Sequence, residues 1–338
     1  MTDISHMSEG ELEYMLSKPS PQVRKTVAAL DGDIAVLGAG GKMGPTLAMM
    51  LQEAAGGKQV YAVSRFSDQG VKTRLTAAGI EVVEADLLDP LWHNTLPRAA
   101  NVYYLVGMKF GASGNQPLTW AMNAYLPGAM AQHYKDSRIV VLSTGNVYPY
   151  VDAGTRVSEG TPVDPVGEYA QSCLGRERIC QYFSQQNRTP MTLVRLNYAN
   201  EPRYGILVDL TLKIMHDEPI DLSVPAVNLI WQRDANDYIV RAITLTQSPP
   251  TILNLAGSET VMVREAAAEI GRMLGKSPRF AAAEGTKCLL SDASYCFEQF
   301  GLPATGLREM IAMIASWVAA GKATLNKPTK YDVRDGRF

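Results

Sequence analysis

The sequence has few of the side chains that hold metals or form disulfides. Its 338 residues include only four cysteines and four histidines. Cys173, Cys180, Cys288 and Cys296 have neither CxxC spacing nor the spacing of a zinc site, and the histidines are scattered. We therefore expect no metal site, and four buried, reduced thiols of the kind found in cytoplasmic proteins.

The chain also lacks long apolar runs and an excess of charge of either sign. No apolar run reaches the ~18 residues that a membrane span needs. The first residues, MTDISHMSEGELEYML, are acidic and do not read as a secretion signal. Lysine and arginine total 32 against 34 acidic residues, a net charge of −2. This composition favours a small-molecule substrate over nucleic acid or a membrane as partner, and a cytoplasmic location.

What the sequence does contain is a glycine-rich turn between an apolar run and a helix. Residues 33–44 read DIAVLGAGGKMG, and the run at 34–37 suits a buried parallel strand. Gly38, Gly41 and Gly44 follow it. Strand, glycine turn and helix together are typical of a dinucleotide site, because the bare turn admits a diphosphate at the helix N-terminus. A glycine loop alone is weak evidence, and a tight turn without ligand is the alternative.

Further strands are expected over residues 59–63, 81–83, 101–106 and 139–142, separated by helical segments. This alternation predicts an α/β fold with a Rossmann-type doubly wound parallel sheet and a smaller C-terminal substrate-binding lobe. The expected divisions are a helical leader over 1–31, an NAD(P)-binding domain over 32–200 with returns near 226–257, and mainly the substrate lobe and tail over 201–338.

The two ends of the chain carry different signals. Residues 8–30 look helical, with Ser8 and Glu11 spaced as a capping box, and are expected to form a clasp or an oligomer contact. The charged tail would ordinarily fray, although Tyr331 and Phe338 could dock on the body.

The end of the second expected strand bears on the choice of dinucleotide. An acid about 20 residues past the glycines would bind the ribose 2′-OH of NAD. This chain has Ser64 and Arg65 there, with no acid until Asp68, and a hydroxyl with a guanidinium suits a 2′-phosphate better. Lys42 in the glycine loop adds positive charge. The sequence thus favours NADP slightly, and NAD stays open if Arg65 is solvated and Asp68 turns back.

Motifs in a fixed order make residues 32–260 similar to extended short-chain dehydrogenase/reductases of the NAD-dependent epimerase/dehydratase family. Each motif is weak alone, but their order is specific. They are the glycine loop, Asp86-Leu87, Val106-Gly107-Met108-Lys109, Asn123, Ser143-Thr144 with Val147-Tyr148, the approach to Tyr169 through Glu159, Pro162 and Pro165, and the later segments at 195–198, 234–236 and 254–257.

The residues and the resemblance together imply a set of site residues. Tyr169 would move a hydroxyl proton, Thr144 would steady the reacting oxygen, and Lys109 would complete the catalytic group. The implied cofactor contacts are Gly38, Gly41, Lys42, Met43, Gly44, Ser64, Arg65, Asp86, Leu87, Val106, Gly107, Asn123, Tyr169 and Asn197. The implied substrate contacts are Lys109, Asn146, Asn197 and Arg203.

The chain departs from the family four residues after the tyrosine. Family members carry a lysine there, whose ammonium lowers the phenol's pKa and holds the nicotinamide ribose. Here the residue is Cys173, and a thiol can do neither. Lys109, at the end of the fourth expected strand, is the first candidate for a replacement cation. Arg176, two helical turns past Tyr169, is the second.

Two further departures concern the substrate. Gly145 and Asn146 stand where family dehydratases place an Asp–Glu pair, which argues against that elimination. Val227 stands seven residues before Asp234, where sugar-nucleotide enzymes carry a diphosphate-binding arginine. Arg203 could pair with a carboxylate instead, so a sugar acid is preferred to a nucleotide sugar.

The leading expectation is an NAD(P)-dependent oxidoreductase or epimerase. It would act on a hydroxyl or keto carbon of a small carbohydrate-like substrate, in a homodimer. Two alternatives stay open because the lysine is missing: a non-catalytic dinucleotide-binding sensor or structural protein, and a non-redox lyase or isomerase with tightly held cofactor. The retained Tyr169, Thr144 and Asn123 favour the first, since a binding protein has no need of the hydroxyl pair.

Overall fold

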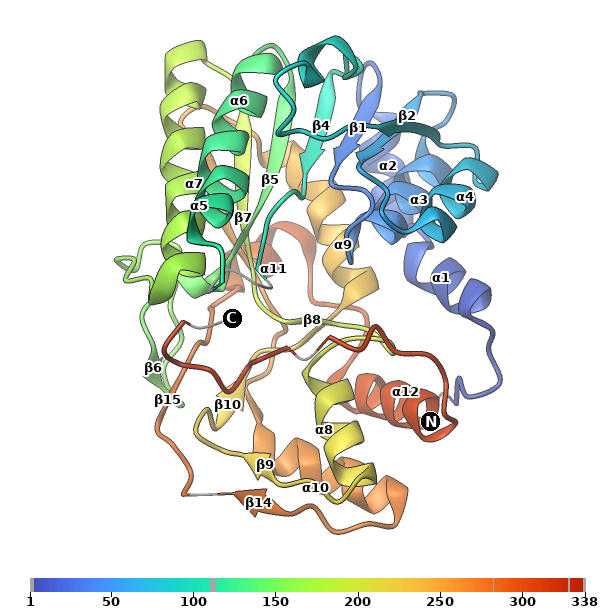
Figure 1. Cartoon of the computed structure of the whole chain (residues 1–338), viewed down its shortest axis with the longest axis vertical. Coiled ribbons are helices and arrows are strands. Elements are labelled where there is room, and N and C mark those ends of the chain that lie inside the picture. The colour runs from blue at the N-terminus through green and yellow to red at the C-terminus, as the bar shows by residue number, and fades with distance from the viewer. Residues whose placement is uncertain (1–2, 110–113, 282, 328, 337–338) are drawn as a thin grey trace.

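A seven-stranded parallel sheet forms the centre of the molecule (Figure 1). The computed structural model describes residues 3–109, 114–281, 283–327 and 329–336. The strand order is β12-β7-β5-β4-β1-β2-β3, which reverses between β1 and β4. Such a reversal is where open α/β sheets bind ligands, so the expected Rossmann-type fold is confirmed. The strands are β1 (Ile34–Leu37), β2 (Val60–Ser64), β3 (Glu81–Glu84), β4 (Asn101–Tyr104), β5 (Arg138–Thr144), β7 (Met191–Leu196) and β12 (Thr251–Leu255).

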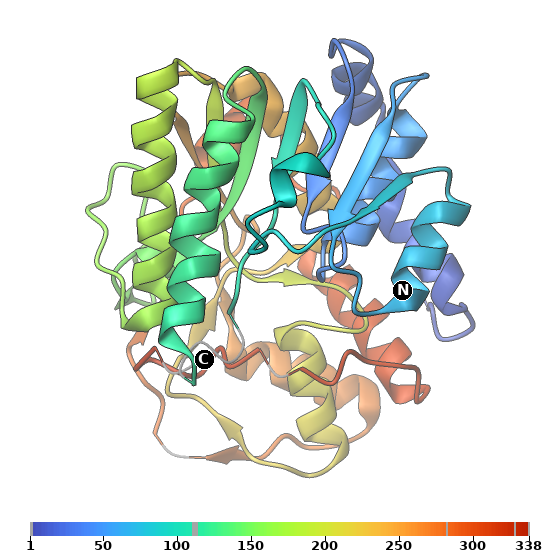
Figure 2. The same cartoon turned by 45° about the horizontal axis from the view of Figure 1, so that its top comes forward.

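Helices cover both faces of this sheet (Figures 1 and 2). Alternate residues of each buried strand point to opposite sides, so both faces carry apolar side chains that the helices bury. In β1, Ile34 and Val36 join one core, and Ala35 and Leu37 join the other. The first face carries α2 (Pro21–Ala28), α3 (Gly44–Ala54), α4 (Gln69–Ala77), α9 (Gln232–Arg241) and α11 (Ser294–Phe300). The second carries α5 (Gln116–Trp120), the π-helical η2 (Ala121–Tyr125), α6 (Leu126–His133) and α7 (Gly167–Asn187).

Two strand ends differ from the expected ones. β5 continues to Thr144 instead of ending at residue 142, since Ser143 and Thr144 still pair with β7. β4 ends at Tyr104, so Val106 and Gly107 belong to the loop after it. Both shifts place the candidate residues at the carboxyl edge of the sheet.

A smaller lobe packs against that edge around its own hydrophobic core. Its helices are α8 (Ile206–Met215), α10 (Val263–Leu274) and α12 (Leu307–Ala319). The short remaining elements are β6 (Val151–Asp152), β8 (Ala199–Asn200), β9 (Ile220–Asp221), β10 (Ala226–Val227), β11 (Ile230–Trp231), β13 (Val261–Met262), β14 (Phe280–Ala281), β15 (Lys287–Cys288), η1 (Trp92–Asn94), η3 (Gly145–Val147) and η4 (Ala242–Leu245).

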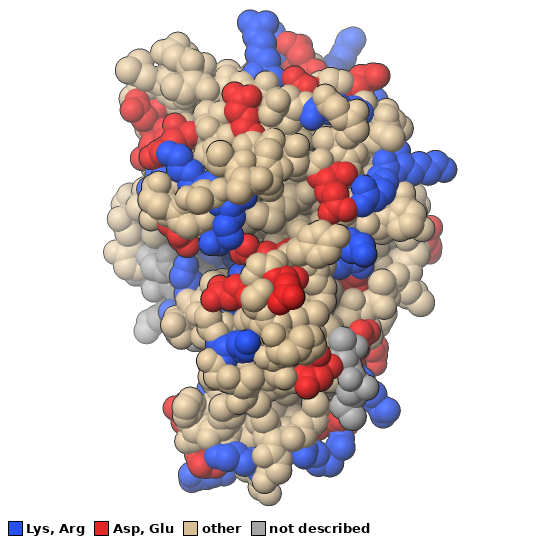
Figure 3. All heavy atoms as spheres, turned by 90° about the vertical axis from the view of Figure 1, so that its right-hand side faces the viewer, with Lys and Arg blue, Asp and Glu red and all other residues tan. Residues whose placement is uncertain are grey.

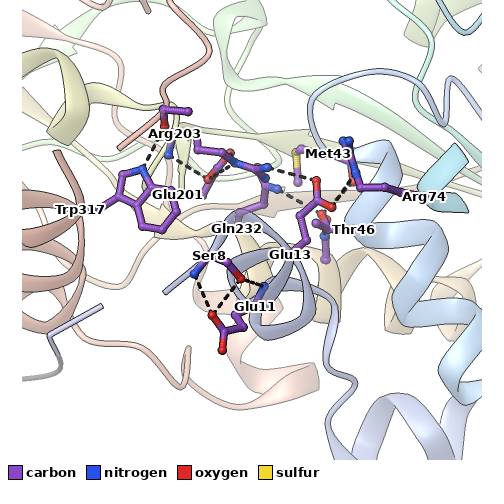
Figure 4. Close-up of polar contacts among 12 residues, drawn as sticks. Ser8, Glu11, Glu13, Met43, Thr46, Arg74, Glu201, Arg203, Gln232 and Trp317 are labelled. Atoms are coloured by element: carbon purple, nitrogen blue, oxygen red, sulfur yellow. Dashed lines mark hydrogen bonds and ion pairs between the residues drawn. The ribbon is translucent and has the colours of Figure 1, made fainter. Parts of the chain in front are cut away.

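The N-terminal helix α1 (Glu9–Ser17) joins the two parts of the chain. It begins with the expected capping box of Ser8 and Glu11. Its Glu13 is almost fully buried, and its carboxylate accepts from Arg74 of α4 at 2.8 Å and from Arg203 at 3.1 Å (Figure 4). The leader therefore acts as a clasp within the chain.

The tail does not fray but crosses between the lobes (Figure 1). We call residues 324–327 and 329–336 the C-terminal strap. The Leu325 N–H donates to the Arg203 carbonyl at 2.8 Å. Thr329 is buried and donates its N–H and hydroxyl to Asp209 Oδ2 of α8, at 2.9 and 2.5 Å.

The far end of the strap reaches the start of α7. Tyr331 is buried in the core of the small lobe, so the expectation that it docks is met, whereas Phe338 lies outside the described residues. The Tyr150 hydroxyl donates to the Val333 carbonyl at 3.0 Å. Gly336 lies so close to Gly167 that a Cβ on Gly167 would meet its Cα at 2.6 Å. The strap thus ties the small lobe to the first residue of α7.

The surface carries charges of both signs (Figure 3), and the thiols are buried. On the face that carries the first helices, acidic and basic side chains are interspersed (Figure 3). Within the described ranges no helix has both the length and the apolarity to cross a membrane. All four cysteines are free and buried, as expected.

Candidate functional site

Two adjoining cavities open at the carboxyl ends of the strands and share Gly38, Gly41, Leu105 and Gly107. The outer cavity is lined further by Gly40, Ser64, Arg65, Phe66, Ser67, Ala85, Asp86, Leu87, Val106 and Met122. The inner cavity is lined further by Lys42, Met43, Gly44, Lys109, Leu142, Ser143, Thr144, Asn146, Tyr169, Arg176, Leu196, Asn197, Tyr198, Ala199, Asn200, Tyr204, Gly205, Ile206 and Thr329.

The glycine loop forms the wall between the two cavities, and its backbone geometry requires glycine at two positions. Gly38 has φ +88°, a region that side chains disfavour. A Cβ on Gly44 would meet the Cα of Ala39 at 2.6 Å, so a side chain there would push α3 away from the loop. The N-terminus of α3 consequently faces bare backbone, which suits a diphosphate.

The outer cavity gathers the residues expected around an adenosine. Ser64 and Arg65 follow β2, and Asp86 and Leu87 follow β3. Asp86 also accepts the Leu88 N–H at 3.0 Å, the ordinary capping role of an aspartate. Arg65 is exposed at this rim.

We expected the charge of Lys42 near Arg65, but the Lys42 side chain lies on the opposite side of the glycine loop. Its Nζ donates to the Ala199 carbonyl at 2.6 Å and lies 3.9 Å from the centre of the Tyr204 ring. It lines the inner cavity and not the outer one that holds Arg65. Desolvation lowers the pKa of Lys42 to about 7. Lys42 therefore gives no support to a 2′-phosphate beside Arg65.

The catalytic candidates meet in the inner cavity. Thr144 ends β5 and Tyr169 lies in the first turn of α7, and both line the inner cavity. The Thr144 hydroxyl donates to Asn146 Oδ1 at 3.0 Å. Desolvation and Cys173 raise the pKa of Tyr169, whereas the charge of Arg176 and the neighbouring Thr144 side chain lower it.

Both candidates for the missing cation border the same cavity. Lys109 Nζ donates to the Thr329 carbonyl at 3.2 Å, and desolvation lowers the pKa of Lys109 to about 8. Burial raises the pKa of Cys173, and the charge of Arg176 opposes that shift more strongly than the charge of Lys109. Arg176 is the cation that opposes the raised pKa of Tyr169.

Two of the expected contact residues, Asn123 and Arg203, line neither of the two cavities. Asn123 is fully buried and borders neither cavity. It accepts the Met108 N–H at 2.8 Å and donates to the Met108 carbonyl at 2.9 Å, so it holds the loop backbone. The Arg203 guanidinium pairs with Glu201 and Glu13 and borders a separate cavity (Figure 4). We leave Arg203 out of the proposed substrate site because two carboxylates already occupy it.

A buried polar network holds the catalytic strand against α7. The Glu177 carboxylate accepts from Arg195 Nη2 at 2.7 Å and from the Ser143 hydroxyl at 2.6 Å. Arg195 Nη1 donates to the Tyr148 hydroxyl at 2.7 Å, which in turn donates to Asn254 Oδ1 at 2.7 Å. The network crosses β5, α7, β7 and β12, and so fixes the residue next to Thr144.

Several residues that line the inner cavity were not assigned a site role from the sequence, namely Ser143, Tyr198, Asn200 and Thr329. Ser143 and Tyr198 lie inside motifs that the sequence displays, so motif neighbours could have indicated them. Thr329 comes from the strap and has no local signal. Among the described residues no group of three or more His, Cys, Asp or Glu side chains could hold a metal ion.

A family model described as the NAD dependent epimerase/dehydratase family matches residues 34–204. No curated protein sequence matches. Among solved structures, UDP-glucuronic acid 4-epimerase from Bacillus cereus is 17% identical with TM-score 0.74, covering 85% of this chain and 99% of that one.

Two further structures are similar at low identity. MoeE5, in complex with UDP-glucuronic acid and NAD, is 21% identical with TM-score 0.69, covering 86% of this chain and 100% of that one. dTDP-glucose 4,6-dehydratase from Bacillus anthracis is 13% identical with TM-score 0.73, covering 85% and 96%. These structures support the fold, and the family model covers half of the chain. The chain therefore belongs to the NAD-dependent epimerase/dehydratase family, among the extended short-chain dehydrogenase/reductases.

Proposed function

We propose that the protein is an NAD(P)-dependent oxidoreductase or epimerase that acts on a hydroxyl or keto carbon of a small carbohydrate-like substrate. The observation that carries the proposal is that Tyr169 and Thr144 line the same cavity, which begins at the glycine loop. We also propose the division into a coenzyme domain over 32–200 and a substrate lobe over 201–338.

The residues present fit a nicotinamide dinucleotide. The bare corner at Gly38 and Gly41 suits the diphosphate, and Leu87 could pack an adenine ring in the outer cavity. Gly107, shared by both cavities, would lie at the nicotinamide end. When bound, the coenzyme supplies the hydride acceptor or donor at C4 of its ring.

The chain's own groups would move the proton. In oxidation, the substrate hydroxyl hydrogen passes to the phenolate of Tyr169 as the hydrogen on the same carbon leaves as hydride. Thr144 would orient that oxygen, and Asn146 fixes the Thr144 hydroxyl. Epimerisation needs the same groups and a keto intermediate that can present its other face before the hydride returns.

The charge of the inner cavity favours a sugar acid. Lys42, Lys109 and Arg176 are among its lining residues, and no Asp or Glu of the described part of the chain is. The solved relatives described with UDP-glucuronic acid bind a nucleotide sugar. In this chain Val227, at the position of the expected diphosphate-binding arginine, is buried and paired with Val261 of β13. The proposed substrate is therefore a small acid without the nucleotide.

A coenzyme and substrate screen tests the proposal. The purified protein would be offered NAD and NADP with sugar acids, neutral sugars, polyols and UDP-sugars. Reduced-nicotinamide absorbance reports oxidation, and chromatography of the products reports epimerisation. Turnover of a small acid supports the proposal. Turnover only of UDP-sugars, or none with any substrate, contradicts it.

Substrate affinity should depend on pH if the two lysines attract the acid. Their ammonium groups are charged below pKa values of about 7 for Lys42 and about 8 for Lys109, and become neutral above them. Calorimetry on coenzyme-loaded protein should show the Kd of a sugar acid rising above pH 7 and more steeply above pH 8, by roughly tenfold per unit for each ammonium lost. The Kd of the matching neutral sugar should stay flat, and equal pH dependence of both would contradict the idea.

Arg65 should decide between the two coenzymes. Arg65→Ala is expected to raise the Kd of NADP by roughly ten- to a hundredfold, the usual worth of a hydrogen bond to a charged group, and to leave NAD unchanged. Fluorescence titration with the reduced coenzymes measures both. Lys42→Met is the control, because Lys42 faces the inner cavity and should leave the NADP-to-NAD ratio as it was. Equal losses for both coenzymes in Arg65→Ala would contradict the NADP preference.

One observation favours a second candidate function. Cys173, the residue in the lysine position, is buried and free. Without a lysine, the protein could bind the dinucleotide as a sensor or clamp, or act as a lyase or isomerase without net redox change. Coenzyme binding with no turnover in the screen favours the sensor, and turnover with no exchange of hydride favours the lyase.

We propose, finally, a cytoplasmic homodimer. Trp120, Tyr125 and Tyr182 are exposed on the helical face formed by α5, η2 and α7. Large aromatic side chains gathered on one helical face commonly mark an interface between subunits. Sedimentation of the wild-type protein against Tyr182→Glu checks this, since a monomer in both would exclude it.

A further inference from the structure

Three residues of α7 follow one another along the helix at one-turn spacing beside the inner cavity. Tyr169 lies in its first turn, Cys173 one turn on and Arg176 almost another. Cys173 is fully buried in a small hydrophobic cluster against which Tyr169 packs. The long side chain of Arg176 reaches from the second turn of α7 to strand β5. The short side chain of Cys173 lacks that length.

The Arg176 guanidinium is held rigidly where it lies. Its Nη1 donates to the Leu142 carbonyl of β5 at 2.5 Å, its Nε to the Asn123 carbonyl at 3.3 Å, and its Nη2 to Asn123 Oδ1 at 2.9 Å. Only 5% of the residue is exposed, yet it lines the inner cavity with Tyr169. The side chain is therefore buried along its length and presents its guanidinium at the cavity wall.

Gly107 makes room for this guanidinium. A Cβ on Gly107 would lie 2.6 Å from Arg176 Nη2 and 3.2 Å from Asn123 Oδ1. Gly107 is the loop residue shared by the inner and outer cavities, and Asn123 holds the next residue, Met108, by both backbone groups. The cation thus lies directly behind the backbone that would face the nicotinamide end.

The charge of Arg176 is not cancelled by an acid in these contacts. Its acceptors are two carbonyls and one amide oxygen. The titratable groups that face it are Tyr104 of β4 and Tyr169, Cys173 and Cys180 of α7, all neutral when protonated. The neighbouring Glu177 is engaged by Arg195 and Ser143.

We propose that Arg176 replaces the family's lysine as a positioning residue: its guanidinium stabilises the phenolate of Tyr169 and supports the Gly107 backbone. A positive charge can serve from residue 176 because Arg176 and Tyr169 line the same cavity. The catalytic role of Arg176 rests on the proposed function, but the effect of Arg176 on the protonation of Tyr169 can be measured without turnover.

The test uses variants that separate charge from hydrogen bonding. Arg176→Gln keeps donors for Leu142 and Asn123 without the charge, and Arg176→Lys keeps the charge. The double variant Cys173→Lys/Arg176→Gln returns a cation to the family's position. Thermal melting and coenzyme Kd establish that each variant is folded and loaded.

The readout is the protonation of Tyr169. Ring-labelled tyrosine gives a carbon NMR signal that Tyr169→Phe identifies by its loss. In protein loaded with oxidised coenzyme, Arg176→Gln is expected to shift the Tyr169 titration upward by about one pH unit or more, the usual effect of an opposite charge. Arg176→Lys and the double variant should titrate within about half a unit of the wild type.

The outcomes are distinguishable. A Tyr169 titration that is the same in wild type and Arg176→Gln overturns the inference, as does a shift that the double variant fails to reverse. If a substrate is found, the kcat/KM profile should move by the same amount, with a loss of at least about tenfold at neutral pH. Absence of turnover in the wild type would count against the proposed function and leave the NMR result standing.

Discussion

Tyr169→Phe is expected to lower kcat by at least about a hundredfold, since general acid–base catalysis contributes at least that much. The substitution removes one oxygen from a side chain that faces the inner cavity and leaves the ring in place. The Thr144 hydroxyl on the same cavity wall already donates to Asn146 Oδ1, so its proton is engaged elsewhere. The Kd of the coenzyme should change by less than about fivefold, since one neutral hydrogen bond is worth about 1 kcal/mol. Steady-state kinetics and fluorescence titration measure the two quantities.

A buried tyrosine elsewhere provides the control. Tyr134 donates its hydroxyl to the Pro97 carbonyl at 3.0 Å, away from both cavities. Tyr134→Phe should leave kcat within about twofold of wild type while costing a similar hydrogen bond. If Tyr169→Phe retained wild-type turnover, the phenol would have no part in proton transfer and the proposed mechanism would fail.

Arg195→Met is expected to destabilise the fold by about 3–5 kcal/mol, the cost of breaking a buried ion pair from one side. The substitution leaves the carboxylate of Glu177, which is 0% exposed, with only Ser143 among its present donors. It also removes the donor to Tyr148. Urea denaturation followed by circular dichroism gives the free energy of unfolding. We expect the midpoint to fall with little change in slope.

The matched control is a surface pair. Lys72 and Glu84 lie 2.7 Å apart but are both largely solvated, so Lys72→Met should cost less than about 1 kcal/mol. A double variant, Glu177→Leu/Arg195→Met, removes both buried charges and should recover much of the loss. An Arg195→Met protein as stable as Lys72→Met would mean that water or another group solvates Glu177.

Local chemistry made much of this structure predictable. The apolar run and glycines at 34–44 fix a strand, a turn and a helix within a dozen residues, and the structure has each of them. The capping box of Ser8 and Glu11 spans three residues and formed as expected. Helical spacing also allowed Arg176 to be named as a candidate, because Tyr169 and Arg176 share one helix.

What the sequence could not reveal depends on partners far along the chain. Arg203 appeared suited to a substrate carboxylate, but it pairs with Glu201 and also with Glu13, 190 positions earlier. Lys42 could have turned toward either cavity, and the Ala199 carbonyl, 157 residues away, decides the direction. No spacing rule connects such pairs, because the tertiary fold alone brings them together.

The strap has a consequence for how the protein is made. Thr329 contributes to the inner cavity, and Gly336 packs on the residue that begins α7. A ribosome delivers the glycine loop almost three hundred residues earlier, so a growing chain can fold a coenzyme cradle long before it can enclose a substrate. Residues 329–336 should therefore matter for enclosing the substrate and not for forming the coenzyme cradle.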